Sequence, residues 1–337
     1  MKYFVTGGTG FIGTKVIERL IEGGHEVVGL TRSAPNASHL PDEVSVVEGD
    51  ITTKESLREP MMGVDGVFHM AAWYFIGPGR RAAAEANRIN VDGTRNVMEL
   101  TAELEIPKAV YTSSVAVYGD TGGKVVDETD EPEPPGICVY FDSKWRAHYE
   151  VVRPMIDDGL PVVVVQPGAV YGPGDKEYGS VRQPFLDWLE GDLPMLPRKF
   201  IFPFDHVDDV AQAHLLAMED GKIGEEYIIA NEPREVVELF DMAEAMTGIS
   251  SPRAVSPAWF QLLAKLLAPV DRLWSLPAGF QPEMFRTYGG TQNLVDNSKA
   301  EQDLGIDHRP IEEGLREYLR WELEQLGLDT QQIEKTK

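Results

Sequence analysis

Short apolar runs alternate with amphipathic stretches through the first two-thirds of the chain. The runs are Phe4-Val5, Val27 to Leu30, Val44 to Val47, Val67-Phe68, Ala109 to Thr112 and Val162 to Val165. They are almost wholly apolar, as expected of parallel strands that are covered on both faces. Between the first two runs lies a helix-period segment, Phe11 to Ile21, which the pair Gly23-Gly24 ends. This order predicts an α/β protein with a doubly wound parallel Rossmann sheet.

The regular order of strands and helices changes after about Gly172. Prolines then separate short helical stretches, at Pro173, Pro184, Pro194, Pro197 and Pro203. We therefore expect a dinucleotide-binding domain over residues 1–172 and a smaller, irregular substrate-side lobe over 173–327, interleaved with the sheet. A terminal helix from Ile311 to Leu326 has apolar residues on one face. The polar tail, residues 328–337, is expected to fray.

Charge narrows the range of partners. The 337 residues include 31 basic and 55 acidic ones, for a net charge of -24. Such a surface repels phosphate backbones and anionic lipid, so we expect a small-molecule substrate and neither nucleic acid nor a membrane as partner.

The start of the chain and its single cysteine bear on where the protein works. The chain begins with a strand-like run, Lys2 to Thr6, instead of a signal peptide, and its longest apolar stretch, Ala254 to Val270, is interrupted by polar residues and prolines. Cys138 has no second cysteine to pair with and is interpreted as a small buried residue. These features predict a cytoplasmic protein.

A glycine-rich turn follows the first predicted strand. In Thr6-Gly7-Gly8-Thr9-Gly10-Phe11-Ile12-Gly13, three glycines stand where a dinucleotide fold needs a tight turn, a bare backbone against the pyrophosphate, and close helix–strand packing. A plain turn is the alternative for a glycine triplet alone. Its position between a strand and a helix favours cofactor binding.

Residues after the second and third strands bear on the choice of cofactor. An acid at the end of the second strand would hydrogen-bond a ribose 2′-hydroxyl, but the residue there is Arg32, which can pair with a 2′-phosphate. The alternative is a solvated surface arginine. Asp50, after the third strand, can accept a hydrogen bond from the adenine amino group, or cap a helix starting near Thr53. We expect NADP, with NAD as the alternative.

A tyrosine and a lysine carry the strongest chemical signal. Tyr140 and Lys144 form Y-x-x-x-K on a predicted helix, one turn apart on one face. A neighbouring ammonium favours the phenolate of a tyrosine, and it can also hold the nicotinamide ribose. Upstream, Ser114 ends a predicted strand, where its hydroxyl can donate to a substrate carbonyl. We predict a Ser–Tyr–Lys site for redox chemistry.

With these motifs in view, the chain resembles the extended short-chain dehydrogenase/reductases, which include NAD-dependent epimerase/dehydratases and dihydroflavonol-reductase-like enzymes. The segments TGGTGFIG, GDI, HMAA, NVDGT, SSVAVYG, YFDSK, VYGPGD and HVDDVA occur in family order over roughly residues 1 to 325. The resemblance implies a homodimer and the catalytic residues Ser114, Tyr140 and Lys144. It also implies cofactor contacts from Gly7, Thr9, Gly10, Phe11, Ile12, Arg32, Asp50, Ile51, Ala71, Ala72, Asn90, Tyr140, Lys144, Pro167 and Val170.

Two further segments have competing interpretations. A histidine and two acids in His206 to Asp209 could suggest a metal site, but a helix start with N-terminal carboxylates is favoured, so no metal is expected. The apolar residues of Trp259 to Leu267 are interpreted as core or subunit packing, with a lid over an apolar substrate as the alternative.

The expected function is NADP(H)-dependent reduction or oxidation of a small, apolar carbonyl or hydroxyl compound. A nucleotide-sugar epimerase or dehydratase using the same site, and a non-catalytic dinucleotide sensor, remain alternatives. Family members that bind nucleotide sugars commonly carry R-x-x-N-x-Y-G-P and an arginine before the HVDD-like histidine. Here those positions are Gln166, Ala169 and Phe202, which favours an apolar pocket floor of Ala169, Val170 and Phe202.

Overall fold

The computed structural model describes residues 1–74, 80–176, 181–273, 276, 282–330 and 333. Its largest sheet has seven strands in the order β11-β7-β5-β4-β1-β2-β3, and every adjacent pair is parallel. The strands are β1 (Lys2–Thr6), β2 (Glu26–Thr31), β3 (Ser45–Glu48), β4 (Gly66–His69), β5 (Ala109–Thr112), β7 (Val162–Gln166) and β11 (Glu226–Ile228). The predicted doubly wound Rossmann sheet is confirmed.

The strand interior is apolar because helices cover both faces. All residues of β4, β5 and β7 are buried. The edge strand β3 differs, since Ser45, Val46 and Glu48 are exposed and Val47 is only half-buried. The expectation that all six runs are covered on both faces is therefore wrong for β3, which lies at the edge of the sheet.

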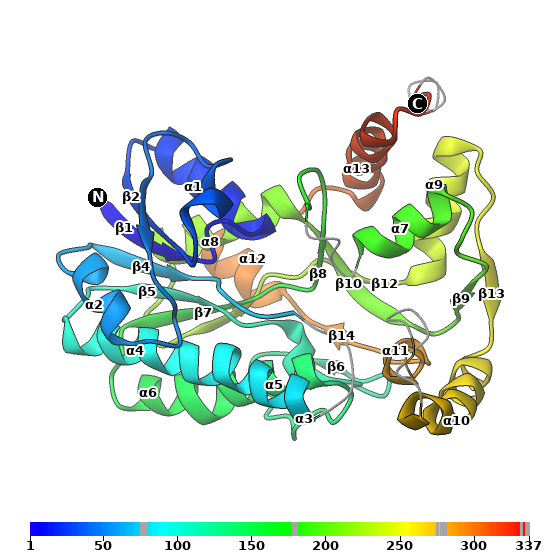
Figure 1. Ribbon diagram of the computed structural model, residues 1–337, viewed down its shortest axis with the longest axis horizontal. Coiled ribbons are helices and arrows are strands. Elements are labelled where there is room, and N and C mark those ends of the chain that lie inside the picture. Colours follow the sequence, from blue (N-terminus) through cyan, green and yellow to red (C-terminus); the bar gives the residue numbers. More distant parts are fainter. Residues whose placement is uncertain (75–79, 177–180, 274–275, 277–281, 331–332, 334–337) are drawn as a thin grey trace.

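Two layers of helices sandwich the sheet (Figure 1). On one face, α1, α8 and α12 place apolar side chains in one core cluster with residues of β1 and β7. On the other face, α2, α4 and the segment η4 pack in a second cluster. The bounds are α1 (Phe11–Glu22), α2 (Glu55–Met61), α4 (Gly93–Glu103), α8 (Val207–Glu219), α12 (Ser298–Leu304) and the π-helical η4 (Ala147–Val152).

Two long helical passages on the second face contain π-helical turns. The first runs through α3 (Arg80–Ala86), η2 (Asn87–Asp92) and α4, and the second through α5 (Val139–Arg146), η4 and α6 (Arg153–Asp157). Single π turns inside α-helices occur frequently at functional sites. Here they lie on the passages that carry Asn90 and Tyr140.

The rest of the chain forms a lobe beside the sheet. The chain first reaches it with β6, enters it again with β8 after β7 of the sheet, returns to the sheet with α8 and β11, and then leaves again, so lobe and sheet are interleaved (Figure 1). Its strands are β6 (Val125–Val126), β8 (Ala169–Tyr171), β9 (Met195–Pro197), β10 (Ile201–His206), β12 (Pro233–Glu235), β13 (Arg253–Val255) and β14 (Leu294–Val295). Its helices are α7 (Arg182–Leu189), α9 (Val236–Thr247), α10 (Pro257–Leu273), α11 (Pro282–Tyr288) and α13 (Ile311–Leu326).

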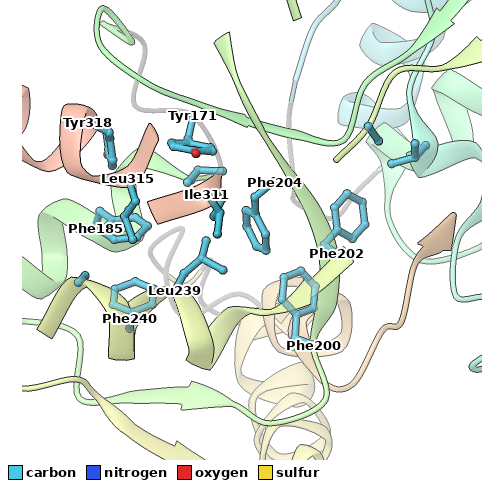
Figure 2. Packing of buried hydrophobic residues seen from close by; sticks show 14 of the residues in the cluster. Tyr171, Phe185, Phe200, Phe202, Phe204, Leu239, Phe240, Ile311, Leu315 and Tyr318 are labelled. Carbon is cyan, nitrogen blue, oxygen red and sulfur yellow. The ribbon is translucent and has the colours of Figure 1, made fainter. Parts of the chain in front are cut away.

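An aromatic cluster forms the core of this lobe. Figure 2 shows side chains of β10, α7, α9 and α13 meeting there. Phe185 and Phe240 stack with ring centroids 4.4 Å apart, and Tyr318 meets Phe185 edge-on at 5.4 Å. Helix α13 has the predicted bounds, whereas most of the predicted polar tail lies outside the described residues. Among the described helices, none has the length and apolar character needed to cross a membrane.

Candidate active site

The predicted site residues gather along one edge of the main sheet. Because its strands are parallel, their carboxyl ends share this edge, where ligands of doubly wound folds bind. The residues that follow the strands are Gly7 after β1, Arg32 after β2, Asp50 after β3, Ala71 after β4, Ser114 after β5 and Pro167 after β7. One edge therefore presents residues from six strands to one elongated ligand.

The glycine turn is shaped by contacts that leave no room for side chains. Gly7 has a φ of +73°, and a methyl group on it would lie 2.6 Å from the backbone nitrogen of Ala71. A methyl group on Gly13 would lie 2.1 Å from the Gly7 carbonyl oxygen. Helix α1 begins at Phe11 without a side-chain cap from any described residue, so its first N–H groups can bind an anion. The half-buried Thr9 and Ile12 flank the turn.

At the adenine end, Arg32 is exposed and lies near Asp50. Burial raises the pKa of Asp50, but two hydrogen bonds from Thr52, each 2.8 Å, and the charges of Arg88 and Arg32 bring it below its usual value. The capping alternative for Asp50 is wrong, because α2 begins only at Glu55. Asp50 is thus an ionised acceptor beside an exposed guanidinium.

A carboxylate that the sequence argument missed also reaches this end of the site. The backbone nitrogen of Ala34 donates a 2.8 Å hydrogen bond to Oε1 of Glu48 on β3. Glu48 is not among the residues that follow β2, where an acid was expected, but β3 pairs with β2 and brings Glu48 opposite Thr31. Glu48 therefore has to be weighed against Arg32 when the cofactor is assigned.

Ile51, next to Asp50, is buried, and its side chain lies against Gly93.

Tyr140 faces Ser114 at the end of β5. Burial and the Cys138 thiol raise the pKa of Tyr140, and the Ser114 hydroxyl, which can donate a hydrogen bond to the phenolate oxygen, opposes that rise. The Ser114 hydroxyl itself accepts from the Ala116 backbone at 3.1 Å and lies 3.4 Å from the Pro167 carbonyl oxygen. The hydroxyls of Ser114 and Tyr140 can therefore both form hydrogen bonds with one substrate oxygen.

Lys144 lies one helical turn from Tyr140, beneath the same edge. Its side chain is buried, its ammonium nitrogen donates to the Thr112 carbonyl oxygen at 2.7 Å, and it lies 5.3 Å from the ring centroid of Tyr111. Burial lowers the pKa of Lys144 to about 7. An amine with this pKa can exchange a proton near neutral pH, which suits general acid–base work.

Asn90, expected to contact the cofactor, has its amide engaged by the protein. Its Oδ1 accepts from the Trp73 backbone at 2.6 Å, and its Nδ2 donates to the Trp73 carbonyl at 3.0 Å and to Ser143 at 2.9 Å. These bonds tie the loop after β4, which carries Ala71 and the exposed Ala72, to the helix of Tyr140. Asn90 thus holds the loop after β4 in place relative to the helix of Tyr140.

Two buried side chains support the serine loop without having been predicted. Nδ2 of Asn293 donates to the carbonyl oxygens of Val115 and Gly119 at 2.9 and 3.0 Å, on either side of the turn after Ser114. His148 meets the hydroxyl of the adjacent Ser113 at 2.8 Å. The sequence did contain a signal for His148. It follows Tyr140 and Lys144 at the same four-residue interval, which places all three on one helical face.

The histidine and acids in His206 to Asp209 stand at a helix start, as predicted, with Asp208 and Asp209 in the first turn of α8. His206 caps the helix by accepting a 3.3 Å hydrogen bond from the Asp208 backbone. Its ring, Asp208 and Glu317 lie close enough to share an ion. However, the guanidinium of Arg309 is 2.7 Å from Glu317 and 3.1 Å from Asp209. Arginine therefore supplies the positive charge that this cluster needs.

Tyr140 packs against the aromatic cluster of the lobe. Tyr74 meets Tyr140 edge-on at 4.7 Å, and Phe141, the next residue, lies 6.3 Å from Phe202. Phe202 stacks on Phe200 at 6.0 Å, as Figure 2 shows. Ala169 packs in this aromatic cluster.

The expectation that Val170 shares an apolar floor with Ala169 and Phe202 is wrong. Successive side chains of a strand point to opposite faces, so Val170 packs against the cluster of α1 and α8, whereas Ala169 packs against the aromatic cluster of the lobe.

Comparison with known proteins follows from this geometry. The sequence model of the NAD-dependent epimerase/dehydratase family matches residues 3–230. The chain belongs to this family. As a member of the extended short-chain dehydrogenase/reductases, it is an NAD(P)-dependent oxidoreductase. The match spans the whole sheet edge described above, from the glycine turn to β11.

Relatives and solved structures extend the match over nearly the whole chain of this family member. A candidate dihydroflavonol 4-reductase of Synechocystis sp. is 32% identical over 332 residues, covering 95% of this chain and 94% of the relative. Sterol demethylase protein B of Methylococcus capsulatus is 30% identical over 279 residues, covering 81% of this chain and 83% of its own.

Among solved structures, that of gox2253 superposes with a TM-score of 0.82 at 31% identity and covers 97% of this chain and 99% of its own. The dTDP-glucose 4,6-dehydratase DesIV of Streptomyces venezuelae, with NAD and TYD bound, has a TM-score of 0.77 at 23% identity, covering 97% of this chain and 98% of its own. At that identity the likeness to the dehydratase shows a shared fold.

Proposed function

We propose that this protein is an NADP(H)-dependent reductase or dehydrogenase that acts on the carbonyl or hydroxyl group of a small, apolar substrate. The observation that carries the proposal is the aromatic cluster of the lobe, with Phe200 and Phe202, against which Tyr140 packs; we call it the aromatic wall. Phe202 is only 7% exposed and belongs to the same cluster as Ala169. A nucleotide diphosphate needs cationic or multiple neutral donors, and these two side chains offer neither.

The cations next to Phe202, across the strand pair or just before it in the sequence, are either paired with acids or lie on an exposed turn. Arg234, paired across the strands with Phe202, is 3.1 Å from Glu232 and 3.8 Å from Glu238. Arg198 and Lys199 lie on an exposed turn that precedes β10. On a chain with a net charge of -24, a diphosphate would also approach against the overall field. A neutral substrate avoids both penalties.

Proton transfer is assigned to Tyr140 and carbonyl polarisation to Ser114. A nicotinamide bound at the sheet edge would supply or accept the hydride at the substrate carbon. In the reducing direction, the Tyr140 hydroxyl gives its proton to the carbonyl oxygen while the Ser114 hydroxyl donates a hydrogen bond to the same oxygen. The substrate leaves as an alcohol, and solvent reprotonates Tyr140. The ammonium form of Lys144, one turn away, favours the phenolate that this step leaves behind.

The residues present fit a dinucleotide. Gly7 and Gly10 leave the backbone bare where the pyrophosphate would lie, and Asp50 would accept from the adenine amino group. We assign NADP as the preferred form because Arg32 is exposed at the end of β2 and offers a fork of donors to a 2′-phosphate. The negative charge of Glu48 disfavours a 2′-phosphate, so removing that charge should increase the preference for NADPH over NADH. We further propose a cytoplasmic homodimer, built on the helices of Asn90 and Tyr140.

The test is a calorimetric titration of the NADP-loaded protein with UDP, dTDP and GDP sugars. We expect no binding in the micromolar range. Micromolar binding that is lost on replacing Arg198 and Lys199 by alanine would overturn the assignment and identify an epimerase or dehydratase. A matched control replaces Arg253 and Lys265, two other exposed cations of the lobe, by alanine.

A further inference from the structure

Helix α10 presents apolar side chains on two faces. Phe260 and Ala264 are buried, and the Phe260 ring meets Phe285 of α11 at 5.7 Å. The opposite face carries residues at helical spacing that are exposed to solvent by 59, 44, 59 and 38%, namely Trp259, Leu262, Leu266 and Val270. Of the two interpretations of this stretch, core or subunit packing, core packing is therefore excluded for the outward half, and subunit packing stays a prediction.

An outward apolar stripe of this kind requires a partner. Helices that are apolar all round are found buried in a core or against another apolar phase. Large exposed apolar patches on soluble domains mark interaction sites. Here the stripe follows one helix for three turns and combines a tryptophan with leucines, which is typical of helices that lie in a membrane interface.

Local charge distinguishes this surface from the rest of the molecule. Residues 251–290 contain four lysines or arginines and two acids, a net charge of +2, whereas the whole chain has -24. Lys265 on α10, Arg286 on α11 and Arg253 on β13 are all exposed. Arg198 and Lys199, on the turn after β9, are also exposed, and β9 pairs with β13. The whole-chain charge argued against anionic lipid, but these five exposed cations, Arg198, Lys199, Arg253, Lys265 and Arg286, give this end of the lobe local groups that can pair with anionic headgroups.

We propose that the outward face of α10 docks on the surface of an anionic lipid bilayer, with the helix axis in the plane of the interface. Trp259, Leu262 and Leu266 enter the boundary between headgroups and acyl chains, and Lys265 contacts the headgroups. Helix α10 has 17 residues and no described helix can span a bilayer, so the contact is peripheral. In Figure 1, α10 and α11 lie at the lobe end of the long axis, away from β1 and β2.

A second copy of the chain fits this surface less well. A two-fold interface places the same patch on both partners, so Lys265 and its neighbouring cations would meet their own copies. An anionic bilayer complements them instead. The placement also suits the active site: α11 ends at Tyr288, whose ring meets Phe200 of the aromatic wall at 5.0 Å. The docking itself does not depend on the proposed reaction.

The experiment is flotation of the full chain with vesicles of phosphatidylcholine alone, or of phosphatidylcholine and phosphatidylglycerol in equal parts. We expect the protein to float with the anionic vesicles. Leu262→Asp with Leu266→Asp should weaken binding at least about tenfold, since one leucine's burial is worth about that factor. The control pair, Met62→Asp with Ile223→Asp, changes residues that are 58 and 55% exposed on other elements, and it should bind like wild type.

Lys265→Glu provides a second variant that leaves the apolar stripe intact. It should weaken binding to the anionic vesicles about fivefold or more, because a lysine near such a surface is worth about that factor. Absence of binding, equal binding to both vesicle types, or equal losses in the aspartate pair and its control would overturn the proposal. So would a dimer of the wild-type chain that the aspartate pair dissociates in gel filtration, which would assign the face to a second copy.

Discussion

The two walls of the active site are built from different materials. The sheet edge presents bare backbone and a few polar side chains, each placed by the end of a buried strand. The lobe presents aromatic rings, such as Phe202 and Tyr288, that come from β10 and α11. The first wall repeats wherever a dinucleotide binds this fold, because its geometry follows from the strand ends. The second depends on individual side chains, and under the proposed function it is the wall that selects the substrate.

Tyr140 lies between the sheet edge and the lobe. A change at this residue should therefore separate turnover from cofactor binding most clearly. Replacing it by phenylalanine removes the proton donor and leaves the ring. Turnover should fall by about 10²-fold or more, the usual contribution of general acid–base catalysis, while the dissociation constant for NADPH stays nearly the same. Steady-state kinetics and calorimetry measure the two quantities.

Tyr149→Phe is the matched control, since that half-buried tyrosine lies further along the same helical passage. It should keep wild-type turnover. If Tyr140→Phe retained more than about half of the activity, the assignment of the proton donor would be wrong.

On the sheet edge, Thr31→Asp combined with Arg32→Asn should reverse the preference for NADPH over NADH. The change places an acid where a 2′-phosphate would lie and removes its guanidinium, and charged hydrogen bonds of this kind are worth about tenfold to a hundredfold in affinity. Dissociation constants for both cofactors are the measurement. Glu48→Gln should change the ratio in the other direction. Equal constants for NADPH and NADH in the wild-type protein would contradict the assignment of Arg32.

On the lobe wall, Phe202→Leu should raise the KM for an apolar carbonyl substrate several-fold and leave cofactor affinity unchanged. Loss of part of a buried aromatic contact of this size costs on the order of 1 kcal/mol. Phe185→Leu is the matched control, because Phe185 is equally buried in the lobe but stacks on Phe240. Both variants should lose similar stability. A KM that rises equally in both would show that Phe202 acts only through folding.

A separate effect, on folding stability, concerns the buried lysine Lys144. The pKa of Lys144 is about 7 in the folded, cofactor-free protein, well below its ordinary value, because of burial. Between pH 7 and 10 the unfolded chain therefore holds more protons, so the free energy of unfolding should rise with pH by up to about 1.4 kcal/mol per unit. Lys144→Met lacks this contribution. Urea unfolding of both proteins across this range should give diverging curves, and parallel curves would contradict the proposed burial.

The sheet edge could be predicted from sequence because its signals are local. Strand, turn and helix follow one another within a few residues at Gly7 to Gly13, and Tyr140 and Lys144 share one helical turn. Such patterns need no knowledge of which distant segments meet. The edge strand β3 was the exception, since its exposure depends on its place in the sheet, and Glu48 was missed for the same reason.

The lobe could be predicted only in part because its contacts join distant segments. Asn293 braces the turn after Ser114 from the far end of the chain, and Arg309 closes the acidic cluster of α8 from the loop before α13. No spacing rule connects such residues. The sequence left the outward face of α10 open between core and subunit packing, because an apolar helical stripe looks the same in sequence whether it faces the core, another subunit or solvent.

The central claim, a reductase with an apolar substrate wall, is tested most directly by net consumption of reduced cofactor. Aromatic or terpenoid-like aldehydes and ketones, and separately UDP-glucose, are mixed with the protein and excess NADPH, and the reduced nicotinamide is followed to completion. The account predicts that one NADPH disappears for each alcohol formed from an apolar carbonyl compound, with no reaction of the sugar nucleotide. Conversion of the sugar nucleotide without net loss of reduced cofactor, together with inert apolar carbonyls, would contradict it.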